Sequence, residues 1–150
     1  MLRSLLLVLL LAAPLCAEKK VINPDEFRPA AGAPAPMFNA GILVDGTLYA
    51  AGQIGVDLKT GAVPDSFEDE VKLCLHRIEL VLRDAQMTFG DVVSVQVYLT
   101  DTDLFARMNA VYGKVFTTEL GNARPARTTV GVTKLALPKA RIEITVTARK

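Results

Sequence analysis

The chain has 150 residues, of which 51% are hydrophobic and 22% charged, which is enough for one domain with a buried core. Its formal net charge is only +1 at pH 7. Nucleic-acid-binding domains normally carry a strong basic footprint, so this balance argues against a nucleic-acid partner. The sequence contains one histidine and two cysteines, Cys16 and Cys74. If the N-terminal segment that contains Cys16 is removed, one histidine and one cysteine remain, which excludes a Cys/His zinc site within a single chain.

Residues 1–17, MLRSLLLVLLLAAPLCA, have the pattern of a secretory signal peptide, with one early arginine, an apolar run and a small residue at the end. The apolar run is about half the ~20 residues that a membrane-spanning helix needs, so a permanent anchor is not expected. We predict cleavage after Ala17, export to the periplasm or the medium, and a single mature domain of residues 18–150 without membrane attachment. Lipid attachment at Cys16 and a retained leader remain open alternatives.

The first elements after the leader are β-structure. The stretch up to residue 40 is rich in proline and glycine, so it predicts a short strand at most and then an extended arm. In GILVDGTLYA, Asp45-Gly46 separates two β-rich runs, which is the strongest short signal for a hairpin. A loop follows from residue 57 to 65.

Residues 66–86 give the clearest helix signal. Ser66, with Asp69 three residues later, resembles a capping box. Apolar residues recur at helical spacing and define one buried side. These are Phe67, Val71, Cys74, Ile78, Val81 and Ala85. On the outer side, Glu68–Lys72 and Glu79–Arg83 are spaced for i,i+4 ion pairs.

A strand and a second helix follow. DVVSVQVYLT alternates along its length, which is typical of a half-buried strand. One side carries Val93, Val95, Val97 and Leu99, and the other Ser94, Gln96 and Tyr98. The next helix is expected from about Asp103 to Thr117. Its expected inward side chains are Phe105, Met108, Val111 or Tyr112, and Val115 or Phe116.

The stretch PARTTVGVTKLALPKARIEI, residues 125–144, reads as two strands joined by a loop, a half-buried hairpin. Alternation places Arg127, Thr129 and Glu143 on one polar face. The element order β-β-α-β-α-β-β then predicts an α+β domain with two helices on the apolar face of a mostly antiparallel sheet.

The opposite sheet face carries small polar residues and few charges, so another subunit could cover it and form ligand clefts at the boundary. In such a cleft, Arg127 would bind a carboxylate through two parallel hydrogen bonds, and Glu143 would orient or deprotonate a water. A plain cross-strand salt bridge between Arg127 and Glu143 is the alternative that the pattern leaves open.

Four segments, KKVIN, LYAAGQIGVD, MNAVYGKVF and PARTTVGV…LPKARIEI, resemble the Rid (YjgF-like) family of reactive-intermediate deaminases, from about residue 19 to 148. The resemblance implies a chorismate-mutase-like protomer and a homotrimer with sites between subunits. Active members hydrolyse 2-imino acids, or their enamines, to 2-keto acids and ammonia without a metal or cofactor. It further implies that Arg127 holds the substrate carboxylate and that Glu143 positions the attacking water.

The same resemblance assigns supporting roles. Gly52 and Gln53 match a Gly-Gln turn that lines the cleft. Asn109 and Tyr112 match the second-helix motif and would support the site or the interface. Thr129 stands where the family often has cysteine, and its hydroxyl could still bind a ligand.

The chain departs from the family pattern at three places. Met37 and Phe38 occupy the segment where active members have a tyrosine that closes over the ligand, which leaves only an apolar lid. Ala51 replaces a frequent serine, and Thr129 the frequent cysteine. Because the tyrosine and serine hydroxyls are lost, a non-catalytic trimer that binds small carboxylates is the alternative function. A ribonuclease activity, sometimes attached to the family, is disfavoured by the neutral charge balance.

Overall fold

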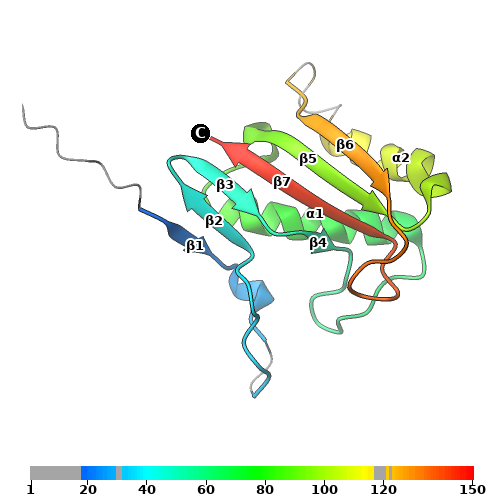
Figure 1. Cartoon of the computed structure of the whole chain (residues 1–150), viewed down its shortest axis with the longest axis horizontal. Coiled ribbons are helices and arrows are strands. Elements are labelled where there is room, and N and C mark those ends of the chain that lie inside the picture. Colours follow the sequence, from blue (N-terminus) through cyan, green and yellow to red (C-terminus); the bar gives the residue numbers. More distant parts are fainter. Residues whose placement is uncertain (1–17, 30–31, 117–120, 122) are drawn as a thin grey trace, which may run out of the picture.

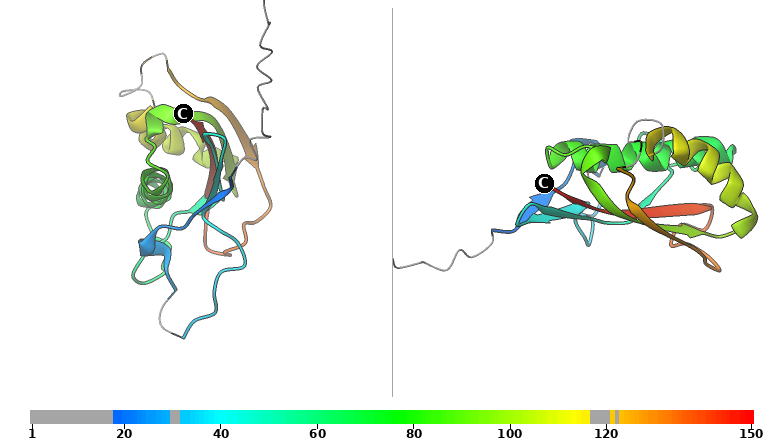
Figure 2. Two further views of the ribbon diagram at one scale, coloured as in Figure 1. Left: turned by 90° about the vertical axis from the view of Figure 1, so that its left-hand side faces the viewer. Right: turned by 90° about the horizontal axis from the view of Figure 1, so that it is seen from above.

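The computed structural model describes residues 18–29, 32–116, 121 and 123–150. The predicted signal peptide, residues 1–17, lies outside this part of the chain. In the described residues, a seven-stranded sheet carries two α-helices on one face (Figure 1). Two further views at right angles place both helices on the same side of the sheet (Figure 2). No helix of the described part is both long and apolar enough to cross a membrane.

The sheet is mixed but mostly antiparallel. Its strands are β1 (Lys20–Ile22), β2 (Gly41–Val44), β3 (Thr47–Ala50), β4 (Gln53–Ile54), β5 (Val92–Leu99), β6 (Ala126–Gly131) and β7 (Ile142–Arg149). They lie in the order β1-β2-β3-β7-β5-β6, with the short β4 also pairing with β7. β5 and β6 are parallel, and the other described pairs are antiparallel.

Two α-helices cover this sheet. They are α1 (Phe67–Asp84) and α2 (Phe105–Phe116), and three short 3-10 turns are η1 (Asp25–Phe27), η2 (Phe89–Asp91) and η3 (Thr102–Leu104). The predicted class, two helices on one face of a mostly antiparallel α+β sheet, is confirmed.

The predicted hairpin between β2 and β3 is confirmed. Asp45 and Gly46 both have left-handed backbone conformations, with φ of 48° and 70°. This geometry matches the twist of the flanking strands and is the reason that Asp-Gly is favoured in two-residue hairpin loops. The hairpin is further held by Arg149, which donates to the hydroxyl of Thr47 at 2.6 Å.

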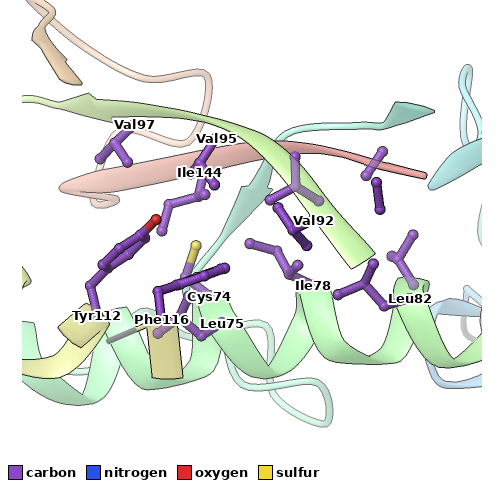
Figure 3. Close-up of a cluster of buried hydrophobic side chains, with 14 of the residues drawn as sticks. Cys74, Leu75, Ile78, Leu82, Val92, Val95, Val97, Tyr112, Phe116 and Ile144 are labelled. Atoms are coloured by element: carbon purple, nitrogen blue, oxygen red, sulfur yellow. The ribbon is translucent and has the colours of Figure 1, made fainter. Parts of the chain in front are cut away.

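Helix α1 forms where the sequence predicts it. The Ser66 hydroxyl accepts a hydrogen bond from the backbone N–H of Asp69 at 3.3 Å, so the helix begins with a side-chain cap. All six predicted inward residues are buried. Figure 3 shows Cys74, Ile78 and Leu82 pointing from α1 toward the sheet.

The predicted ion pairs on the outer side of α1 are wrong. Lys72 pairs with Asp69 and Glu79 with His76, each one residue closer than predicted. The other two members, Glu68 and Arg83, pair with residues of other elements. Long exposed side chains reach several partners, so helical spacing alone does not decide between them.

The prediction for β5 needs one correction. Val95, Val97 and Leu99 are fully buried as predicted, but Val93 is 50% exposed and Val92 is buried in its place. An irregularity in the pairing with β7 between Val92 and Ser94 shifts the alternation at the start of the strand.

Helix α2 confirms most of its predicted inward face. Met108, Val111, Tyr112 and Phe116 are buried, and the rings of Tyr112 and Phe116 stack with centroids 4.4 Å apart (Figure 3). Phe105 was predicted to point inward, but it is 41% exposed, because it occupies the first turn of α2 beside Arg127.

The closing strands do not form a hairpin. β5 lies between β6 and β7, and β6 is the outermost strand on its side of the sheet (Figure 1). The connection through α2 makes β6 parallel to β5, as a β-α-β crossover requires. Residues 132–141 then cross the end of β5 to reach β7, where Thr100 N–H donates to the carbonyl of Arg141. The two strands were predicted correctly and their pairing was not.

Candidate functional site

Arg127 and Glu143 lie on opposite faces of the sheet. Arg127 is paired in register with Val95, which is buried beneath the helices, and Glu143 is paired with Tyr98. Paired residues on neighbouring strands share a face, and residues alternate along a strand. Arg127 and Thr129 are therefore on the helix side, whereas Glu143 is on the open side. The prediction that they share one polar face is wrong.

The reason for this error is the edge position of β6. Every residue of β6 other than Thr129 is exposed, so its alternation of small and polar residues contains no signal for an inner face. The alternative prediction, a cross-strand salt bridge between Arg127 and Glu143, is also excluded by their separation across β5.

On the helix side, α2 holds Arg127. One terminal nitrogen of its guanidinium donates to the side-chain oxygen of Asn109 at 2.9 Å. The guanidinium carbon lies 4.6 Å from the ring centroid of Tyr112 and 5.6 Å from that of Phe105. Burial raises the pKa of the Tyr112 hydroxyl, and the nearby Arg127 opposes this rise. The result is an exposed, oriented cation with remaining N–H groups available for a carboxylate.

Thr129 adds an unsatisfied group to this side. Its hydroxyl oxygen is buried and has no hydrogen-bond partner in the described part of the chain. Buried polar groups normally have partners, and leaving one unsatisfied costs about 1–3 kcal/mol. A small pocket of about 290 Å³ lies nearby, lined among others by Asn109, Tyr112 and Arg127. Thr129 is not among the lining residues of this pocket, so its hydroxyl does not face it in the described structure.

On the other side, Glu143 lies in a cleft of about 680 Å³. Gly52 makes room for it, because a Cβ at this position would lie 1.9 Å from a carboxylate oxygen of Glu143. No described residue donates a hydrogen bond to the Glu143 side chain or forms an ion pair with it. The carboxylate therefore faces the cleft without a partner among the described residues.

The other predicted cleft residues divide into two groups. Phe38 lines the cleft, although it is largely exposed, and Met37 is 100% exposed and outside the lining. Gln53 also lines the cleft but is buried, and its amide is occupied: it accepts from Arg77 at 3.2 Å and donates to the Ala51 carbonyl at 3.2 Å. Gln53 is thus placed to shape the cleft floor rather than to offer a free polar group.

Arg77 lines the cleft from α1, although it was not among the site residues predicted from the sequence. Its guanidinium carbon lies 4.2 Å from the ring centroid of Phe27, and burial lowers its pKa. Arginine remains charged at neutral pH even so. The available signal was its place beside the apolar stripe, directly before Ile78, where a helix residue faces the edge of the core rather than open water.

Nucleophilic and metal chemistry have little basis in the described residues. Burial raises the pKa of the Cys74 thiol, which disfavours the reactive thiolate. No group of three or more His, Cys, Asp or Glu side chains is placed to hold a metal ion in the described part of the chain. Among the predicted site residues of the described chain, Arg127 and Glu143 are the charged groups that line pockets.

Comparisons with known proteins agree with this architecture. A family model described as endoribonuclease L-PSP matches residues 28–150. The 2-iminobutanoate/2-iminopropanoate deaminase of Rattus norvegicus is 37% identical over 128 residues, which cover 84% of this chain and 86% of the relative. A RutC family protein of Aquifex aeolicus is 32% identical over 122 residues, covering 81% and 95%.

Solved structures show the same fold. The YjgF gene product of Escherichia coli has a TM-score of 0.74 at 32% identity, over 87% of this chain and 98% of that chain. The structure of E. coli TdcF with bound serine has a TM-score of 0.76 at 28% identity, with the same coverage of both chains. The chain therefore belongs to the Rid (YjgF-like) family, as its motifs predicted.

Proposed function

We propose that the protein is an exported hydrolase that converts 2-imino acids, or the enamines they form, to 2-keto acids and ammonia. The observation that carries this proposal is Glu143, a carboxylate without a partner among the described residues, lying in a cleft against Gly52. Such a carboxylate is able to accept a proton from water. The choice of substrate is supported by the name of the 37% identical deaminase from Rattus norvegicus.

We further propose that two copies build each site within a homotrimer. Arg127 and Glu143 of one chain are on opposite sheet faces, so they do not reach one small ligand together. A second copy that brings its Arg127 to the Glu143 cleft would complete the site. The exposed Tyr49 and Val130 on the open sheet face support coverage by another chain.

In this site, Arg127 of one copy binds the substrate carboxylate through two parallel hydrogen bonds. Glu143 of the other accepts a proton from water as the water oxygen bonds to the imine carbon. The C=N electron pair moves to nitrogen, which takes up a proton. The carbinolamine nitrogen then takes up a second proton, and ammonia leaves as the C–N bond breaks, the hydroxyl loses its proton and the C=O bond forms. One imino acid and one water thus give one keto acid and one ammonia, and no step requires a metal.

A mixing experiment tests both parts of the proposal. Arg127→Ala and Glu143→Gln are each expected to lower imine hydrolysis, the second by about 10²–10⁴ in kcat. If the site lies between copies, unfolding and refolding the two variants together restores activity, because about one quarter of the interfaces then pair an intact Arg127 with an intact Glu143. An inactive mixture whose mass by light scattering is that of the wild type would contradict a shared site.

The assay generates 2-imino acids with an amino-acid oxidase and traps those that remain as semicarbazones. Glu143→Gln also separates the enzyme from the alternative, a protein that only binds small carboxylates. An enzyme loses kcat and keeps ligand affinity in this variant. If wild type hydrolyses no imine and Arg127→Ala alone loses affinity, the proposed reaction is wrong.

Export rests on residues 1–17 and remains a proposal. We expect the protein recovered from the periplasm or the medium of its host to begin at Glu18, as measured by intact mass. A protein recovered from the cytoplasm with residues 1–17 still attached would contradict export.

A further inference from the structure

Arg77 is a half-buried cation in the Glu143 cleft. It projects from α1 and lines this cleft together with Glu143. Two contacts orient it: its Nε donates to the Gln53 side chain at 3.2 Å, and its guanidinium lies 4.2 Å from the Phe27 ring centroid. Gln53 thus holds the Nε edge of the guanidinium, and the Phe27 ring lies against one of its faces.

Within the described residues, Arg77 has no counter-charge. No carboxylate lies within ion-pair distance of it in the described part of the chain, and no described residue accepts a hydrogen bond from its two terminal nitrogens. Arg83, on the same helix, pairs with Glu26. Because burial disfavours an unpaired cation, and lowers the pKa of Arg77, an anion reaching these nitrogens would gain more than at an exposed arginine.

We propose that Arg77 binds a second anionic group on the ligand, so that the preferred substrates are 2-imino dicarboxylates. This inference rests on the proposed function. Arg127 of the neighbouring copy takes the carboxylate beside the imine, Glu143 activates the water, and Arg77 takes the distal carboxylate through the free edge of its fork. The cleft volume of about 680 Å³ is in the range of small-molecule sites.

The kinetic test compares two imine classes. Amino-acid oxidases produce dicarboxylic imines from aspartate or glutamate, and monocarboxylic imines from alanine or leucine. Wild type is expected to prefer the dicarboxylic class. Arg77→Gln should lower the ratio of the two kcat/KM values about 10- to 100-fold, the effect of losing hydrogen bonds to a charged group. Arg77→Lys keeps the positive charge but loses the planar guanidinium, so its kcat/KM ratio should lie between those of wild type and Arg77→Gln.

The matched control is Arg83→Gln, which removes a cation from the same helix outside this cleft and should leave the ratio unchanged. Thermal unfolding followed by circular dichroism identifies any variant that does not fold. An unchanged ratio in a folded Arg77→Gln, or an equal loss for both imine classes, would overturn the proposal.

A binding measurement separates this inference from the proposed reaction. Calorimetry with 2-oxoglutarate and 2-oxobutyrate reports ligand preference without turnover. Wild type should bind the dicarboxylate at least about tenfold more tightly, and Arg77→Gln should lose this difference. If no imine is hydrolysed but the preference depends on Arg77, the reaction is wrong and the dicarboxylate site stands. If wild type shows no preference, the dicarboxylate site is wrong, whether or not imines are hydrolysed.

Discussion

The two halves of the candidate site are positioned by different means. Glu143 is on the central strand β7, between the fully buried Ile142 and Ile144, so the core itself places its backbone. Arg127 is on the edge strand β6, and side-chain contacts with Asn109 and Tyr112 orient it. We therefore expect the position of Glu143 to be disturbed by substitutions that alter packing or the backbone. The position of Arg127 should be disturbed by loss of single side-chain contacts.

The start of β7 is held by an ion pair between a fully buried glutamate and a partly exposed arginine. Glu70 of α1 is fully buried and accepts 2.6 Å hydrogen bonds from both the backbone N–H and the Nε of Arg141. It also accepts a 3.3 Å bond from Ile142 N–H. The remaining guanidinium nitrogens of Arg141 donate to the carbonyls of Pro64 and Asp65. Glu70 thus ties α1 to the strand that bears Glu143.

The largest expected effect follows from this network. Glu70→Ala removes the acceptor of the Arg141 Nε and of two backbone N–H groups, and should lower the free energy of unfolding by about 3–5 kcal/mol. Urea titration measures this change. The control, Asp69→Ala, removes an exposed partner of Lys72 and should cost about 1 kcal/mol or less. Equal losses in the two variants would contradict the role given to Glu70.

The next largest effects are expected from alanine substitutions at Gly52 and Gly55, which flank β4. A Cβ at Gly52 would meet the movable carboxylate of Glu143, so Gly52→Ala should lower kcat about 10- to 100-fold with little loss of stability. A Cβ at Gly55 would lie 2.0 Å from the backbone oxygen of Glu70, so Gly55→Ala should destabilise the fold by about 2–3 kcal/mol. Activity assays should therefore show the larger loss in Gly52→Ala, and urea titration the larger loss in Gly55→Ala.

A smaller effect is expected on the Arg127 half. Asn109→Ala removes the 2.9 Å hydrogen bond to Arg127 but leaves the contact with the Tyr112 ring. The KM for imino acids should rise about five- to tenfold, the worth of one hydrogen bond, with a smaller change in kcat. Lys114→Ala, an exposed change on the same helix, is the control. A loss confined to kcat would place Asn109 in the chemistry instead of carboxylate binding.

Local sequence signals predicted the elements well. The Asp45-Gly46 hairpin, the Ser66 cap and the apolar stripe of α1 all depend on neighbouring residues, and all were found as predicted. The family motif likewise selected Glu143 and Gly52, which the fold brings into contact.

Features that depend on distant segments were not predictable in the same way. The insertion of β5 between β6 and β7 decides the face of Arg127, and no local pattern in an edge strand exposed on both sides reports it. Glu68 pairs with a residue 39 positions away and Arg83 with one 57 positions away, in preference to helix neighbours. Arg77 borders the apolar stripe of α1, but its place in the cleft depends on Phe27 and Gln53, which are distant in the sequence.

The smallest expected effect concerns the connection between the two halves. Arg107 of α2 donates at 2.7 and 2.8 Å to both carboxylate oxygens of Glu68 on α1, so this exposed pair joins the helix that holds Arg127 to the helix that holds β7. The side-chain hydrogen bonds from Arg107 lower the pKa of Glu68 from 4.5 to about 2. Because the pKa of Glu68 is lower in the native state than in the unfolded state, the ion pair stabilises the fold at pH values above the unfolded-state pKa. This stabilisation is lost as the pH falls through the native-state pKa.

Wild type and Glu68→Gln should therefore differ in thermal midpoint at pH 6, and the difference should shrink between pH 4.5 and pH 2. The effect is small because both side chains are partly exposed and the pair is screened by solvent. Arg107→Gln should give the same pH dependence. If the two halves are positioned independently, kcat and KM at pH 7 stay unchanged in both variants. A fall in kcat would mean instead that the contact between the helices contributes to placing Glu143.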